Sequence, residues 1–139
     1  VNAVSNSVVP KFTVVVGNSY GAGNYAMCGK AYDPRLIVAW PSAEIAVMSG
    51  GSASKVLLQI ERAKIEKSGE QIDPIKEDEL LRQISERYKQ STSPYFAASR
   101  LWVDAIIDPT ETRKLLSLGI DMANHNSEIP PFNMGLLQV

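Results

Sequence analysis

The sequence has very few of the residues that form cross-links or bind metals. It contains one cysteine, Cys28, and one histidine, His125, among its 139 residues. A single cysteine excludes an internal disulfide and any zinc site built from several cysteines. We expect no metal site, and Cys28 is expected to be a buried, small apolar residue, as free cysteines commonly are. The low cysteine content favours a reducing compartment.

Net charge and long apolar runs are also scarce. The formal net charge is −1 at pH 7, so the composition gives no long-range attraction to nucleic acid or to an anionic membrane. No apolar run approaches the roughly 20 residues that a membrane span needs. With 45% hydrophobic residues, the chain can form one domain or part of one. It begins at Val1 without Met or a signal-peptide pattern, and we expect it to be cut from a longer protein.

Charge is concentrated in one segment. Residues 61–89 hold 15 of the 29 charged residues, eight acidic and seven basic, whereas residues 1–60 hold six. Apolar residues recur at helical spacing on both sides of a loop at 68–74, which predicts a charged helical hairpin over about residues 52–90. Ser52 is the expected N-cap. The balance of charge argues against a nucleic-acid patch, so we expect the hairpin to be an outer layer.

Short apolar runs and turn residues outline the remaining elements. Strands or buried extended segments are predicted at residues 11–16, 36–40 and 44–48. One helix is expected to start at Ser93-Pro94, and a last one after Asp108. There Asp108 can cap the helix, Pro109 suits its first position, and Glu111 can reach back to the start.

Residues 12–28 read FTVVVGNSYGAGNYAMC and combine an apolar run, a glycine-rich turn and the start of a helix. Phe12 and the valines that follow favour a buried strand, because aromatic and β-branched residues fit a pleated sheet. Gly17, Gly21 and Gly23 would allow positive φ or close backbone approach in the turn. A strand, a turn and a helix start in this order aim free backbone N–H groups at one point, which predicts an anion site formed by the main chain.

The same stretch matches the G-x-S-x-G pattern of a serine hydrolase, in the expected position after a strand and before a helix. Ser19 would be the nucleophile, and His125 lies downstream. The acid could come from any of three aspartates between them, Asp104, Asp108 and Asp121. This gives the order serine, acid, histidine that a triad can have. Against a hydrolase, Asp108 already fits a helix cap, and His125 lies in a polar loop where an exposed histidine is common.

A second interpretation needs no reactive side chain. The backbone N–H groups of Ala22 and Gly23 would begin the helix, where they could hold the oxygen of an enolate or a carbonyl group. Alternatively, the glycines only allow the strand and the helix to pack closely. The residue pattern by itself leaves these alternatives open.

Longer motifs resemble one known family. SYGAGNYAMCGKAYDPR at residues 19–35 and AWPSAEIAVMSGG at 39–51 resemble the carboxyltransferase (beta) subunits of biotin-dependent acyl-CoA carboxylases. PYFAASRLWVDAIIDPTETRKLL at 94–116 resembles the closing segment of the same family, and PPFNMGLLQV at 130–139 is compatible with it. The AGNY and MCG elements are most similar to the methylcrotonoyl-CoA and geranyl-CoA members, because the propionyl-CoA and acetyl-CoA members differ at residues 24–28.

The resemblance implies an α/β fold of the crotonase (ClpP/crotonase) type, a spiral of ββα units. The chain would be the C-terminal part of the second of two carboxyltransferase domains, with the charged hairpin added to it. The N-terminal domain, which holds the CoA thioester in this family, would lie outside the chain. On this basis residues 1–139 form one partial domain.

The resemblance also implies a reaction and a site. The family moves a carboxyl group from carboxybiotin to an acyl-CoA, and backbone amides stabilise the negative oxygen. The corresponding pair here is Ala22 and Gly23, preceded by Gly21. Side chains expected to shape the biotin and acyl pocket are Tyr20, Asn24 and Tyr25. Asn18 and Ser19 depart mildly from the pair that we expect before Tyr20, which leaves the amides intact.

Biotin and an acyl-CoA substrate are the cofactors that the resemblance implies. The sequence contains no Met-Lys-Met biotinylation motif and no ATP-binding glycine loop, so these functions would belong to a biotin carboxylase and biotin carrier partner. A homo-oligomer is expected, in which the N-terminal domain of another subunit completes the site, and the fragment alone is expected to be inactive. The cytoplasm, or the mitochondrial matrix in a eukaryote, is the expected location, without nucleic-acid or membrane partners. A Ser19–His125 hydrolase and a biotin-dependent acyl-CoA decarboxylase subunit of the same fold are the alternatives.

Overall fold

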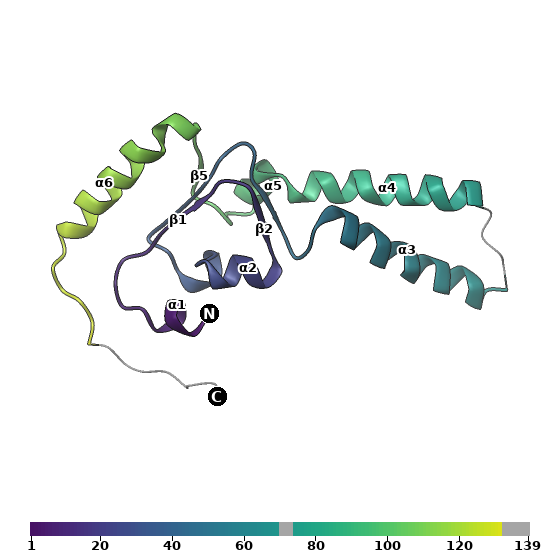
Figure 1. Ribbon diagram of the computed structural model, residues 1–139, viewed down its shortest axis with the longest axis horizontal. Helices are drawn as coiled ribbons and strands as arrows, with labels where there is room; N and C mark the ends of the chain where they lie inside the picture. Colours follow the sequence, from purple (N-terminus) through teal and green to yellow (C-terminus); the bar gives the residue numbers. More distant parts are fainter. Residues whose placement is uncertain (70–73, 132–139) are drawn as a thin grey trace.

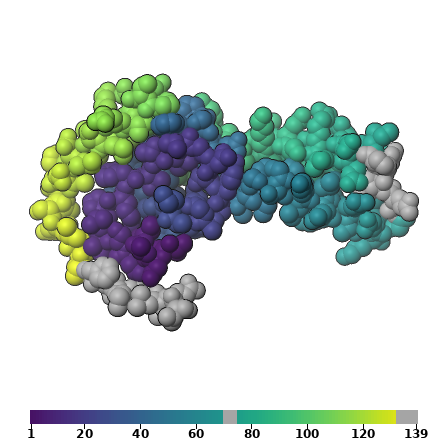
Figure 2. All heavy atoms as spheres, viewed as in Figure 1, coloured from purple at the N-terminus to yellow at the C-terminus, as the bar shows by residue number. Residues whose placement is uncertain are grey.

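The computed structural model describes residues 1–69 and 74–131 as an α/β body from which a helical hairpin projects (Figures 1 and 2). The elements are, in order, α1 (Asn2–Asn6), β1 (Phe12–Val15), β2 (Asn18–Tyr20), α2 (Gly21–Ala26), the 3-10 helix η1 (Lys30–Tyr32), β3 (Leu36–Ala39), β4 (Glu44–Ala46), α3 (Gly50–Lys67), α4 (Pro74–Thr92), α5 (Pro94–Ser99), β5 (Ala105–Ile106), the 3-10 helix η2 (Pro109–Glu111) and α6 (Thr112–Asn124). The expected loop at 68–74 lies partly outside the described residues, and the apolar tail from Phe132 lies wholly outside them.

The strands form two parallel sheets. One has the order β1-β3-β5 and the other pairs β2 with β4. Two successive units therefore have the form ββα, namely β1-β2-α2 and β3-β4-α3, and each gives its first strand to one sheet and its second strand to the other. This repeat agrees with the crotonase-like spiral that the resemblance implies.

The core lies on the larger sheet, where β-branched residues of the central strand are enclosed on both faces. Ile37 and Val38 of β3 are almost completely buried, as expected for a strand covered on both sides in a parallel sheet. Val15, Ala39 and Ile45 join Ile37 in one cluster that also includes residues from α5 and from the segment before β5. Cys28 is buried, as predicted.

The glycine-rich stretch differs from its sequence prediction. Asn18–Tyr20 form strand β2 and pair in register with Glu44–Ala46, so only part of the expected turn is a turn. Among the three glycines, Gly21 alone has a positive φ. A Cβ at Gly17 or Gly23 would meet no atom within 4 Å. The prediction that all three are required by backbone conformation or close approach is therefore wrong for Gly17 and Gly23.

The charged hairpin forms as predicted, with slightly different bounds. α3 begins at Gly50, because the Ser49 hydroxyl oxygen accepts a hydrogen bond from the Ser52 N–H and so acts as the N-cap in place of Ser52. The helices carry exposed ion pairs such as Arg82 with Glu79 and Glu86. Exposed pairs of this kind contribute about 0–1 kcal/mol each, so the hairpin depends mainly on the contact between its two helices.

The last helix packs on the outer strand of the larger sheet (Figure 1). A Cβ at the buried Gly119 of α6 would lie 2.8 Å from Cε1 of Phe12 in β1, so the two elements are in close contact there. Asp108 caps the preceding 3-10 turn by accepting from the Thr110 N–H, as predicted. Glu111 forms an ion pair with Lys114, whereas the sequence predicts that it reaches back to the start of the helix. No helix in the described ranges is both long enough and apolar enough to cross a membrane.

Candidate functional site

The candidate site is the junction between β2 and α2. Gly21 begins α2 with a φ of +50°, a conformation that glycine adopts readily and other residues rarely adopt. The surrounding atoms also require glycine at this position, because a Cβ at Gly21 would lie 2.6 Å from the carbonyl oxygen of Val47, just after β4. The conformation of the junction is therefore set by the backbone that follows the neighbouring strand.

The first amides of α2 have no acceptor within the helix. Tyr20 is the N-cap residue, and its side chain makes no capping hydrogen bond. The N–H groups of Ala22 and Gly23 belong to the first turn of α2 and therefore have no acceptor within the helix, and both residues are exposed. The N-terminus of a helix also carries partial positive charge. This pair of amides can consequently stabilise a negatively charged oxygen.

Two hollows border the start of α2. The larger, with a volume of about 630 Å³, is lined by β1, β2 and residues of α2 that include Gly23 and Asn24. The smaller, of about 340 Å³, is mostly apolar and is lined by residues that include Gly21, Asn24, Tyr25 and Trp102. Asn24 lines both hollows. Gly23 itself lines the larger hollow, and a Cβ at this position would meet no atom within 4 Å.

Tyr20 is fixed to β4 by its hydroxyl group, which donates a hydrogen bond to Oε2 of Glu44. This hydrogen bond raises the pKa of Tyr20 to about 12, and burial and the negative charge of Glu44 act in the same direction. The phenol therefore stays protonated at neutral pH. In this arrangement Tyr20 anchors the junction and has no free hydroxyl with which to act as an acid or a base.

Asn24 and Tyr25 occupy different environments on α2. The Asn24 Nδ2 group donates to Oγ of Ser19 at 2.9 Å. Its Oδ1 lies so near Gly29 that a Cβ there would be 1.9 Å away, so Asn24 is packed in place. Tyr25 is 50% exposed and makes an edge-to-face contact with Tyr32. Of the predicted pocket residues, Tyr25 is thus the one that leaves a large side chain exposed.

Lys30 places a positive charge on the wall of the smaller hollow. Its Nζ lies 3.1 Å from Oδ1 of Asp104, and Oδ2 of Asp104 accepts a hydrogen bond from the Ile37 N–H at 2.9 Å. The Ile37 amide, with Lys30, holds the pKa of Asp104 below its usual range against the effect of partial burial. Asp104 therefore links β3 to the segment before β5. One of the three aspartates considered for a triad thus already has a structural role.

The structure does not assemble the predicted serine hydrolase triad. Ser19 lies within strand β2, whereas a nucleophile elbow needs the serine at the turn between strand and helix. Its Oγ is instead the acceptor for Asn24. No hydrogen bond joins Ser19 to His125 in the described part of the chain, and His125 is exposed at the end of α6.

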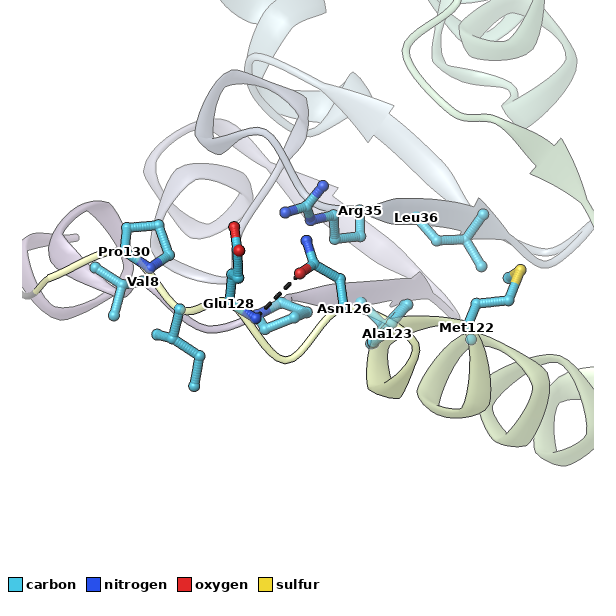
Figure 3. Close-up of a pocket in the computed structure, with 12 residues that line it drawn as sticks. Val8, Arg35, Leu36, Met122, Ala123, Asn126, Glu128 and Pro130 are labelled. Carbon is cyan, nitrogen blue, oxygen red and sulfur yellow. Dashed lines mark hydrogen bonds between the residues drawn. The ribbon is translucent and has the colours of Figure 1, made fainter.

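A third hollow is lined by residues next to His125 and lies near the start of β1. Figure 3 shows this pocket of about 290 Å³, which is lined by Phe12 at the start of β1 and by Asn126 after α6, among others. Oδ1 of Asn126 accepts a hydrogen bond from the Glu128 N–H there. His125 directly precedes Asn126 and so lies near the start of β1. Ser19 belongs to β2, which follows the end of β1. Groups of three or more metal-binding side chains do not occur among the described residues.

Comparison with known proteins identifies the family. The model of the carboxyl transferase domain matches residues 1–135. The probable mitochondrial methylcrotonoyl-CoA carboxylase beta chain of Drosophila melanogaster is 43% identical over 127 residues, which are 91% of this chain and 22% of that protein. The chain belongs to the carboxyl transferase domain family.

Other carboxyl transferase relatives agree with this assignment. The biotin-dependent 3-methylcrotonyl-coenzyme A carboxylase beta1 subunit of Mycobacterium tuberculosis is 42% identical over 90% of this chain and 24% of its own length. The solved beta subunit of P. aeruginosa geranyl-CoA carboxylase is 37% identical, with a TM-score of 0.76, over 99% of this chain and 25% of that one. The fold is therefore the crotonase-like fold of carboxyltransferase beta subunits, and the chain spans about a quarter or less of these relatives.

Several residues of the candidate site were not predicted from the sequence. Glu44, Lys30 and Val47 all contact or border the β2–α2 junction but lie outside residues 12–28, the stretch that predicted an anion site. Glu44 reaches Tyr20 because β2 and β4 pair in parallel with Tyr20 opposite Ala46, which puts Glu44 on the diagonal position of the same face. Only knowledge of that pairing could have linked them.

Proposed function

We propose that this chain is the C-terminal part of the second carboxyltransferase domain in a beta subunit of a biotin-dependent acyl-CoA carboxylase. The whole protein would transfer a carboxyl group to a carbon atom of an acyl-CoA. The observation that carries this proposal is the uncapped start of α2 at the exposed residues Ala22 and Gly23, in a chain that belongs to the carboxyl transferase family.

The role of the two amides is electrostatic. Negative charge develops on a carbonyl oxygen during carboxyl transfer, and two N–H donors at the start of α2 can hold that oxygen without any reorganisation of the protein. Removing one donor of this kind typically lowers kcat by about 10²–10³-fold. The mechanism needs no nucleophilic side chain, which fits a Ser19 hydroxyl that accepts a hydrogen bond from Asn24.

The two hollows suit the two reactants. Biotin supplies the activated carboxyl group when it is bound, and the larger hollow offers the Gly23 amide together with the apolar side chains of Val14 and Val15. Its volume of about 630 Å³ is typical of small-molecule sites. Tyr20 and Asn24 shape its wall. Asn24 and Tyr25 also line the smaller, apolar hollow, which would receive part of the acyl group.

The partners follow from the same assignment. A transcarboxylase 12S subunit, whose structure is described as a hexamer assembly, is 33% identical to this chain with a TM-score of 0.78. We propose a comparable homo-oligomer in which the CoA thioester is held by the N-terminal domain of another subunit, and a separate partner that carries biotin. We also propose a location in the cytoplasm or the mitochondrial matrix. The names of two relatives include the word mitochondrial.

The test is a reconstituted carboxylation assay. The full-length subunit is purified with its biotin-carrying partner, and ATP-dependent transfer of labelled bicarbonate is measured with 3-methylcrotonoyl-, geranyl-, propionyl- and acetyl-CoA. We expect carboxylation of at least one ester, with the first two preferred. Carboxylation of none would contradict the proposal. ATP-independent transfer from a carboxylated CoA ester to biotin as the only activity would support the decarboxylase alternative instead.

A further inference from the structure

Glu44 contacts the amide-bearing junction without belonging to either hollow. The side chain starts at the first residue of β4 and accepts the Tyr20 hydroxyl through Oε2. Its own backbone N–H donates to the carbonyl oxygen of Gly17 at 3.1 Å, just before β2. Glu44 is therefore joined to both ends of β2, once through the backbone and once through the side chain.

Tyr20 is the residue through which Glu44 can influence the amides. Tyr20 is both the last residue of β2 and the N-cap of α2, so its φ and ψ determine the direction in which the helix starts. Its side chain gives α2 no capping hydrogen bond. The hydroxyl bond to Glu44 consequently restrains the orientation of Tyr20 without occupying the N–H groups of Ala22 and Gly23.

The backbone next to the junction is held by a second tyrosine. The Tyr88 hydroxyl of α4 donates to the carbonyl oxygen of Met48 at 2.8 Å. Met48 follows Val47, whose carbonyl oxygen lies against Gly21. The base of the hairpin and the β2–β4 pair thus hold the backbone that lies against the junction.

We propose that Glu44 is a positioning residue for carboxyl transfer, which holds Tyr20 and thereby aims the N–H groups of Ala22 and Gly23 at the reacting oxygen. This inference rests on the proposed function. Its physical basis is that donors must be placed to within a fraction of an ångström, since a misplacement of about 1 Å costs on the order of 100-fold in rate. The half-buried Glu44 carboxylate is the only side chain that accepts the Tyr20 hydroxyl among the described residues.

The experiment uses the full-length carboxylase with its biotin-carrying partner. In Glu44→Ala, kcat should fall by roughly ten- to 100-fold while KM for the acyl-CoA stays within about twofold, because the amides act mainly on charge that develops in the transition state. Glu44→Gln should recover most of kcat, since its amide oxygen can still accept the Tyr20 hydroxyl. Glu86→Ala, which removes a carboxylate from the exposed surface of α4, should match the wild type.

Tyr20→Phe tests the other end of the same hydrogen bond. It should reproduce the loss of kcat seen in Glu44→Ala, and the double variant should be no slower than either single one. Additive losses, a wild-type kcat in either single variant, or no recovery in Glu44→Gln would overturn the inference. If Glu44→Ala does not assemble, Tyr20→Phe, which removes one oxygen atom, decides the question by the same criterion.

A separate change distinguishes failure of this inference from failure of the proposed function. Replacing residue 23 by glycolic acid turns its amide into an ester and removes the N–H without using any side chain. A slow ester variant together with wild-type rates for Glu44→Ala and Tyr20→Phe would reject the positioning role alone. A wild-type rate for the ester variant would reject the amide site itself.

Discussion

Gly21 and Gly23 should respond in opposite ways to the same substitution. In Gly21→Ala, the residue must keep a φ of +50°, which costs about 1–2 kcal/mol for a residue with a Cβ. The new methyl group also starts 2.6 Å from the Val47 carbonyl oxygen, and overpacking against such a fixed group costs about 1–3 kcal/mol. Since both effects act together, the free energy of unfolding should fall by about 2–5 kcal/mol.

Gly23→Ala is the matched control, two residues further along the same helix. Its Cβ would meet no atom within 4 Å, and Gly23 has no positive φ. Alanine is favoured over glycine in a helix by up to about 1 kcal/mol, so this variant should be as stable as the wild type or more stable. Urea unfolding of the full-length protein at equal concentrations measures both changes. The reasoning would be refuted by a Gly21→Ala protein of wild-type stability, or by equal losses in the two variants.

Three further outcomes are expected. Gly119→Ala should lower the urea midpoint, because its Cβ would lie 2.8 Å from Phe12; an unchanged midpoint would contradict the close contact of α6 with β1. In the wild type, the lowered pKa of Asp104 means that its carboxylate contributes stability above the ordinary value of about 3.9, and this contribution is lost as pH falls through the lowered pKa. The stability difference from Asp104→Asn should therefore be constant near neutral pH and shrink in acid; a difference that grows in acid would reverse the assigned sign. A fluorophosphonate probe should leave Ser19 unlabelled by peptide mass spectrometry, whereas stoichiometric labelling that depends on His125 would restore the hydrolase hypothesis.

Local patterns in the sequence were enough to predict the helices and strands that have strong hydrophobic periodicity. The apolar runs predicted β1, β3 and β4, and the helical spacing with alternating charge predicted the hairpin of α3 and α4. The sequence predicts a turn where β2 forms, because Asn18-Ser19-Tyr20 has neither apolar alternation nor a run of β-branched residues. It becomes a strand through its pairing with β4, which is a contact between segments 26 residues apart in the sequence.

The candidate site, too, could be predicted from the sequence only where local residues determine it. The exposed start of α2 could be anticipated from the glycine-rich motif and from the resemblance to carboxyltransferases, and in the structure Ala22 and Gly23 are exposed there, with no side-chain cap from Tyr20. The Tyr20–Glu44 hydrogen bond and the Lys30–Asp104 ion pair could not be predicted, because each joins residues that only the sheet topology brings together. The nucleophile elbow failed for a related reason. A five-residue motif does not specify whether its serine lies in a strand or at the turn.

The most direct test of the account is to remove the two N–H groups one at a time by amide-to-ester replacement at Ala22 and Gly23 in the full-length protein. The matched control is the same replacement at Ala53, whose N–H donates to the Ser49 carbonyl oxygen at the start of α3 and which lines neither hollow. We predict that each ester at the start of α2 lowers kcat for carboxyl transfer by about 100-fold with little change in KM, and that the control loses far less. Wild-type kcat in both variants, or an equal loss in the control, would contradict the claim that these amides stabilise the reacting oxygen.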